Sequence, residues 1–313
     1  MGAFNRLRRK TMKEKSTRKI RLAIVIGLIA LAVLLGVILK NNPKGLVYQF
    51  LILTHVKVNQ PAIYGLFHFI CLIICVALGV FAVAFRNKIT PEQVQNILFY
   101  SGVFLFVLET YKQFYYYYVI YPFGEYNFGI LPLQVCSYSL YLFLIIPLLK
   151  DGVVKRALTL FCALYQTMGG CIVMFYPRFY DILSINLFTM VWHTVMMFNG
   201  ITLLFKSCYK ESFIKDQLPA CIVFLITFVI ANLLNVCLSP YTATSPEPLN
   251  LFYVSPHVPC NYIIIGDVQK AFGWFASVLC YGLMFTALGA PVVWLIGYVV
   301  KFLTKKINGA QYL

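Results

Sequence analysis

Four side chains with acid, base or nucleophilic chemistry lie within apolar stretches of the sequence. Glu109 and Lys112 are three residues apart, so on a helix they share one face and can neutralise each other. His193 is the only histidine in the middle of an apolar stretch, and a neutral imidazole can act as an acid, a base or a metal ligand. Cys136 offers a thiol, which accepts acyl groups once it is deprotonated. Charged and titratable groups at membrane depth are costly and usually functional, so these four residues are the candidates for chemistry.

Each candidate also has a purely structural interpretation. The Glu109 and Lys112 side chains would form an ion pair that seals a helix bundle, and His193 would make one hydrogen bond between helices. Cys136 is one of ten cysteines, most of them in apolar runs where a thiol packs as a small hydrophobe. The ten form no C-x-x-C pair, and no phosphate-binding or nucleotide motif is present, so we predict no metal site and no cofactor.

Composition places the chain in a membrane. Of its 313 residues, 61% are hydrophobic and only 12% are charged, with a mean hydropathy of +0.80. Soluble domains carry about 25% charged residues, so an ordinary soluble enzyme and a disordered chain are both excluded. The net charge of +16 gathers at the ends of apolar stretches, which is typical of membrane orientation rather than of a nucleic-acid surface. Membrane lipids are therefore the expected partners; the sequence identifies no protein partner and predicts no nucleic acid.

The apolar stretches predict an all-α polytopic bundle of eight transmembrane helices. A basic tail, residues 1–21, precedes an extra N-terminal transmembrane helix at 22–40, interpreted as an uncleaved anchor. A seven-helix core then occupies residues 61–301, and residues 302–313 form a second tail. The spans of the core are predicted at 61–85, 96–120, 131–149, 157–176, 182–205, 218–239 and 271–300.

Lys and Arg are distributed unequally between the two predicted sides. With eight spans, 20 of these residues fall on the side of the termini, five fall on the other side and Lys112 lies within a span. Because cytoplasmic loops carry the excess of Lys and Arg, both termini are predicted to be cytoplasmic. The abundance of Phe, Tyr, Ile and Lys suits a multi-pass protein of a bacterial plasma membrane.

The stretch Leu131-Pro132-Leu133-Gln134-Val135-Cys136-Ser137 resembles the L-P-L-H-[LV]-C-[SD] signature of the YwaF-like family of bacterial membrane proteins. That family is related to the eukaryotic transmembrane protein 164 group, which is associated with phospholipid acyl transfer. The resemblance covers residues 61–301. It also rests on Glu109 in the preceding helix, His193 two helices later, Gln166 and Gly169, and the Asn261-Tyr262 pair before the last helix.

The resemblance implies a site for phospholipid acyl transfer or acyl hydrolysis. Cys136 would be the nucleophile, His193 would move the proton, and Glu109 would hold the imidazole or balance the charge. The implied substrate-binding residues are Gln134, Gln166, Lys112 and Asn261.

One departure from the family falls on Gln134, where the family has a histidine. Glutamine cannot take a proton at neutral pH, so His193 would have to serve as the base. By helix rise, Cys136 lies roughly 8 Å and His193 roughly 16 Å below the outer ends of their predicted helices. A nucleophile and its base should approach to about 3 Å.

Two other classes of function fit the same residues. In a transporter or permease subunit, Glu109, Lys112 and His193 would line a polar path, and transport would depend on Glu109 but not on Cys136. In a non-catalytic membrane assembly factor, the Gln134 substitution would mark a site that has lost its chemistry. Such a protein would lose partner binding on mutation without a change in lipid composition.

Overall fold

The computed structural model describes residues 2–121, 126–260 and 262–310, and it is all-helical apart from one isolated bridge between Lys57 and Ile182. Apolar stretches become helices because only a helix satisfies its own backbone groups within lipid. The helices are α1 Gly2–Asn41, α2 Leu46–Leu53, α3 Leu66–Phe85, α4 Pro91–Tyr115, α5 Tyr138–Ile145, α6 Val153–Phe161, α7 Thr167–Phe175, α8 Leu183–Ser207, α9 Phe213–Leu238, α10 Ile263–Leu283 and α11 Ala290–Ala310.

Several helices continue through a turn of wider or tighter winding. Short π-helical segments extend α4 (Tyr116–Ile120), join α6 to α7 (Cys162–Gln166) and join α10 to α11 (Met284–Gly289). Within the described residues, seven helical segments are then long and apolar enough to cross a membrane. They are Glu14–Asn41, Leu66–Phe85, Pro91–Ile120, Val153–Phe175, Leu183–Ser207, Phe213–Thr242 and Ile264–Lys305. The chain is therefore built as a multi-pass membrane protein.

The helix observed within the predicted span 131–149 is shorter than that span. It covers only Val135–Leu148, roughly 21 Å by helix rise against the roughly 30 Å of a bilayer core. Leu131, the residue before Pro132, has ψ 129°, as a proline favours, and Gln134 is still extended with ψ 158°. The count of eight passes depends on this segment.

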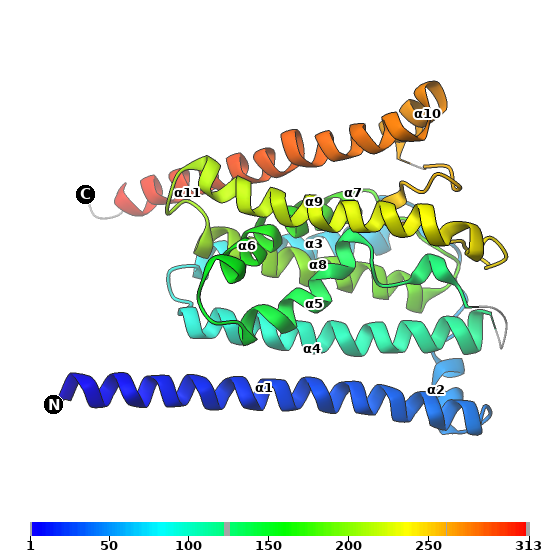
Figure 1. Cartoon of the computed structure of the whole chain (residues 1–313), viewed down its shortest axis with the longest axis horizontal. Coiled ribbons are helices and arrows are strands. Elements are labelled where there is room, and N and C mark those ends of the chain that lie inside the picture. Colours follow the sequence, from blue (N-terminus) through cyan, green and yellow to red (C-terminus); the bar gives the residue numbers. More distant parts are fainter. Residues whose placement is uncertain (1, 122–125, 261, 311–313) are drawn as a thin grey trace.

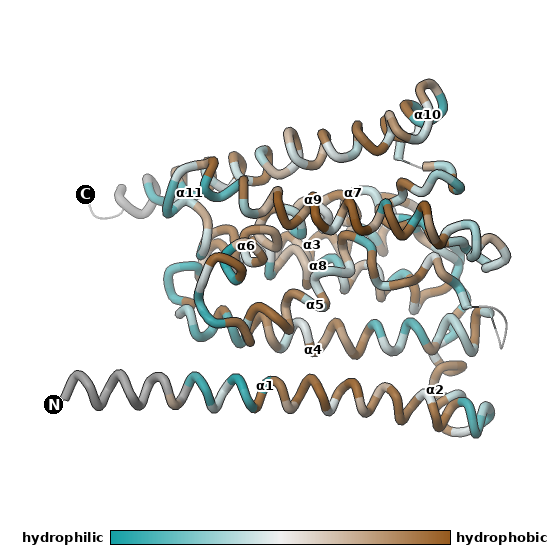
Figure 2. Tube along the Cα trace, viewed as in Figure 1, coloured by the Kyte–Doolittle hydropathy of each residue, from teal (hydrophilic) through white to brown (hydrophobic). Residues whose placement is uncertain are grey.

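Helix α8 lies at the centre of the bundle, with α3, α4, α6 and α7 packed around it (Figure 1). The first turn of α1 and the last turn of α11 lie at the same end (Figure 1). Helix α1 runs along the outside with few of its apolar residues buried, and Figure 2 shows hydrophilic residues just before its apolar part. The basic tail is thus a continuation of the same helix.

Gly102 allows α4 and α5 to approach closely. A Cβ atom there would lie 2.9 Å from the backbone nitrogen of Leu144, too close for either helix to stay in place. We expect Gly102→Ala to lower the free energy of unfolding by about 1–3 kcal/mol, the usual effect of overpacking. Thermal unfolding in detergent measures this, with Gly27→Ala in the exposed part of α1 as the control, since no atom lies within 4 Å of that Cβ. Equal stability of the two variants would contradict the prediction.

Candidate functional site

Glu109 and Lys112 form a buried ion pair on α4, as their spacing predicts. The Lys112 ammonium lies 2.8 Å from Glu109 Oε1, and the two side chains are only 15% and 7% exposed. The amide of Gln113 donates to the same oxygen at 2.6 Å. Glu109 Oε2 is buried and has no hydrogen-bond partner in the described part of the chain. The carboxylate therefore keeps one oxygen free to accept a proton or a donor group.

The pair also fastens the segment before α5 to α4. Lys112 and Gln113 both donate to the carbonyl oxygen of Ile130, at 3.2 and 3.1 Å. The Tyr126 hydroxyl donates to Gln113 Oε1 at 2.6 Å. Burial, together with the charge of Glu109, raises the pKa of Tyr126 to about 12, so its hydroxyl keeps its proton at neutral pH. The charged pair is thus positioned by a loop as well as by its helix.

Cys136 lies in the tight turn Val135–Ser137 that begins the α5 segment. Its carbonyl oxygen accepts hydrogen bonds from Ser139 Oγ at 2.7 Å and from Trp192 Nε1 at 3.2 Å. The residue is partly exposed and lies within electrostatic reach of both Glu109 and Lys112. The thiol itself is enclosed by protein, which disfavours a thiolate, whereas the positive charge of Lys112 favours one.

The side-chain amide of Gln134 is hydrogen-bonded to the backbone of a distant loop. Its nitrogen donates to the carbonyl of Asn250 at 2.8 Å, and its oxygen accepts from the N–H of Phe252 at 2.7 Å. Phe252 has φ 55°, a left-handed conformation that is strained for a bulky side chain. Gln134 therefore holds this strained segment beside Cys136, a structural role that glutamine performs without acid–base chemistry.

Gln166 is hydrogen-bonded to the turn Val135–Ser137 that contains Cys136. It is wholly buried in the π-helical segment between α6 and α7, and its amide donates to the carbonyl of Val135 at 2.8 Å. Its Oε1 is buried without a partner among the described residues. Its hydrogen bond therefore ends on the residue that precedes Cys136, and its role in substrate binding stays a prediction.

His193 is placed on a different face of α8 from the residue that contacts Cys136. Trp192 reaches the Cys136 carbonyl, and one residue further along a helix turns the side chain by about 100°. The His193 Nδ1 lies 2.7 Å from the Thr189 carbonyl, so it carries the proton, and Nε2 is buried with no partner among the described residues. In this arrangement His193 is hydrogen-bonded to neither Cys136 nor Glu109, and the Cys–His pair stays a prediction.

The remaining expectations concern Asn261 and metals. Asn261 lies outside the described residues. Among the residues that are described, no group of three His, Cys, Asp or Glu side chains is arranged to hold a metal ion.

Sequence reasoning missed Tyr126 and Trp192 as neighbours of the site. Tyr126 lies in a loop whose path no periodicity reveals, and its bond to Gln113 spans 13 residues. Trp192 carried a weak signal, since an indole N–H within an apolar helix needs an acceptor.

Comparison with known proteins leaves the family open. No family model matches the chain, and neither a curated protein nor a solved structure matches it. The YwaF-like resemblance therefore rests on the motif residues alone.

Proposed function

We propose that this chain is an eight-pass enzyme of a bacterial plasma membrane, with both termini in the cytoplasm, that transfers or hydrolyses acyl groups of phospholipids at Cys136. The observation that supports it most is the position of Cys136, a partly exposed residue whose thiol lies within electrostatic reach of a buried Glu109–Lys112 pair. The YwaF-like motif around Cys136 points to the same chemistry.

The proposed reaction has two balanced steps. Cys136 Sγ attacks the carbonyl carbon of an acyl ester, the S–C bond forms, and the C–O bond to the glycerol oxygen breaks. The thiol proton passes to that oxygen, which leaves as the hydroxyl of a lysophospholipid. A water molecule or an acceptor hydroxyl then attacks the thioester carbon, takes the acyl group and returns its proton to sulfur.

We assign the proton transfer to Glu109 rather than to His193. Glu109 Oε2 has no hydrogen-bond partner among the described residues, and its carboxylate lies within electrostatic reach of Cys136. His193 Nε2 also has no partner there, but Trp192, on another face of α8, makes the contact with Cys136. Lys112 supplies the positive charge that a thiolate or an oxyanion needs nearby. Its ion pair with Glu109 keeps that charge in place before the substrate binds.

Labelling of membranes with an electrophilic phospholipid analogue tests the proposal. We expect Cys136→Ala to lose the label and to lose lysophospholipid formation, because the proposed acyl-enzyme forms on its sulfur. Cys71→Ala, which removes a partly exposed thiol of α3, should keep both. Glu109→Gln should slow labelling at least tenfold, within the usual range for a general base, while His193→Ala should leave it within a few-fold. Equal labelling of Cys136→Ala and Cys71→Ala would refute the proposal.

A non-catalytic assembly factor is the second candidate, and the bonds of Gln134 favour it. Both polar atoms of the Gln134 amide are held by the backbone of residues 250 and 252, so the position is used to fix a loop. For this candidate we expect no label on Cys136 and unchanged lipid products in a folded Cys136→Ala protein.

A further inference from the structure

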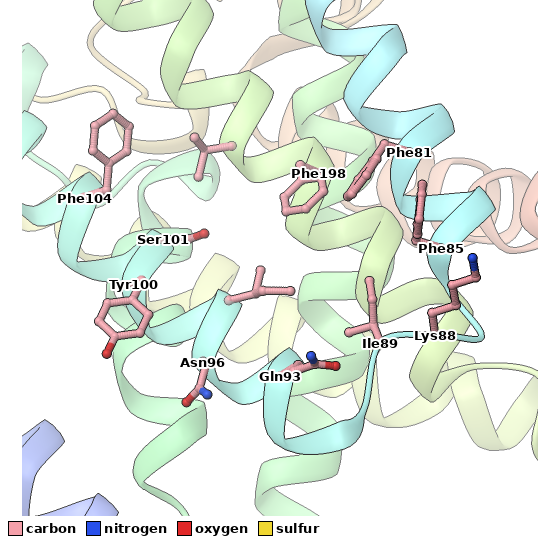
Figure 3. Close-up of a pocket in the computed structure, with 12 residues that line it drawn as sticks. Phe81, Phe85, Lys88, Ile89, Gln93, Asn96, Tyr100, Ser101, Phe104 and Phe198 are labelled. Atoms are coloured by element: carbon pink, nitrogen blue, oxygen red, sulfur yellow. The ribbon is translucent and has the colours of Figure 1, made fainter.

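A groove separate from Cys136 opens between α3 and α4 (Figure 3). Both helices pack on α8 but make few contacts with each other, so α8 forms the floor with Val195 and Phe198. The volume of the groove is about 720 Å³, within the range of roughly 300–1,000 Å³ for ligand sites. Because its walls are membrane-spanning helices, lipid is the solvent that has access to it.

The groove is lined by apolar side chains along most of its length and by polar side chains at one edge. Phenylalanines from all three helices line most of its length: Phe81, Phe85, Phe104 and Phe198. The polar lining side chains, Lys88, Gln93 and Asn96, are spread along the edge where α3 gives way to α4, and Asn96 points away from Lys88 (Figure 3). Of the described residues that line the groove, Lys88 alone is charged, and none is acidic.

The polar end presents donors rather than acceptors. Gln93 Oε1 accepts from the Thr90 N–H, and Asn96 Oδ1 accepts from Arg21. Gln93 thus turns its oxygen toward the backbone and can donate through its NH₂ group, whereas Asn96 is held by Arg21 of α1. Lys88 is exposed and adds an ammonium. An ammonium and an amide donor at one end of an apolar groove are complementary to an anion attached to a hydrocarbon chain.

The length of the groove matches one leaflet. Gln93 and Phe104 are eleven residues apart on α4, roughly 16 Å by helix rise. Half of the roughly 30 Å hydrocarbon core is about 15 Å. A molecule with its anionic group at Lys88 would therefore extend its chain to about the middle of the bilayer.

We propose that this groove binds one anionic glycerophospholipid, with the phosphate at Lys88 and Gln93 and an acyl chain along the phenylalanines. Lys206 adds a second positive charge nearby, because its ammonium donates to the carbonyl of the lining residue Ile89. The site uses the N-terminal half of α4, whereas Glu109 and Lys112 lie in the other half. It is therefore independent of any chemistry at Cys136.

Native mass spectrometry of the full chain in mild detergent tests the headgroup preference. The protein is titrated with phosphatidylglycerol or phosphatidylcholine of identical acyl chains. We expect tighter binding of the first phosphatidylglycerol molecule. Lys88→Gln should weaken that binding about fivefold, which corresponds to about 1 kcal/mol for one lysine at an anionic lipid surface. Lys210→Gln, which removes an exposed lysine outside the groove, should have no effect.

Fluorescence quenching locates the lipid. In phosphatidylcholine vesicles with a small fraction of brominated phosphatidylglycerol, a tryptophan introduced by Phe198→Trp should be quenched more than one introduced by Leu233→Trp, an exposed position of α9. Lys88→Gln should reduce this difference. Equal quenching at the two positions, equal affinity for the two lipids in the unmodified protein, or the same loss in Lys88→Gln and Lys210→Gln would overturn the proposal.

Discussion

Replacing Lys112 by methionine is expected to lower the free energy of unfolding by about 3–5 kcal/mol. The substitution leaves Glu109 buried without its counter-charge, and breaking one side of a buried ion pair usually costs that much. The Ile130 carbonyl would keep its bond from Gln113, so the loss is assigned to the carboxylate rather than to the loop. Reversible unfolding in mixed micelles measures the change.

The double variant Glu109→Gln with Lys112→Met separates charge from packing. With both charges gone, most of the lost stability should return, because a buried ion pair is often replaceable by neutral groups of similar volume. The two side chains touch, so their effects should be strongly non-additive. A double variant as unstable as the sum of the two single variants would show that the pair is not what holds this region.

The hydropathy of the sequence is enough to predict most of the fold. Lipid leaves helix as the only choice for a long apolar run, so the positions of α3, α8 and α9 follow from composition. The Glu109–Lys112 pair was predictable for a similarly local reason, since three residues of helix fix their relative position. The start of the α5 segment was not predicted, because the backbone is still extended at Gln134 although the run around it is apolar.

The relation between Cys136 and His193 depends on information that the sequence does not carry locally. Which face of α8 meets the α5 segment is decided by packing among several helices, and a shift of one residue rotates a side chain by about 100°. In the structure Trp192, rather than His193, contacts Cys136. The role of Gln134 depends likewise on a strained loop more than 110 residues away.

Asp216, at the other end of the bundle, is a further residue whose contacts could not be predicted from the local sequence. The sequence predicts only a basic inner loop there. This carboxylate is fully buried in the first turn of α9. Its Oδ2 accepts from the Tyr209 N–H at 2.9 Å and from Trp294 Nε1 at 3.0 Å. Arg156 lies 3.6 Å from its Oδ1. One aspartate therefore joins the loop after α8 to α6 and α11.

Asp216→Ala is expected to lower the free energy of unfolding by about 3–5 kcal/mol, because it removes a buried charge that two donors and a guanidinium share. Glu211→Ala is the matched control. Glu211 pairs with the same Arg156 but is a third exposed, and such surface pairs contribute about 0–1 kcal/mol. Asp216→Asn, which keeps one acceptor oxygen and the volume, should lose less than alanine does. Unfolding of the three variants under one condition gives the comparison. If Glu211→Ala were as destabilising as Asp216→Ala, the surface pair rather than the buried carboxylate would be holding these helices together.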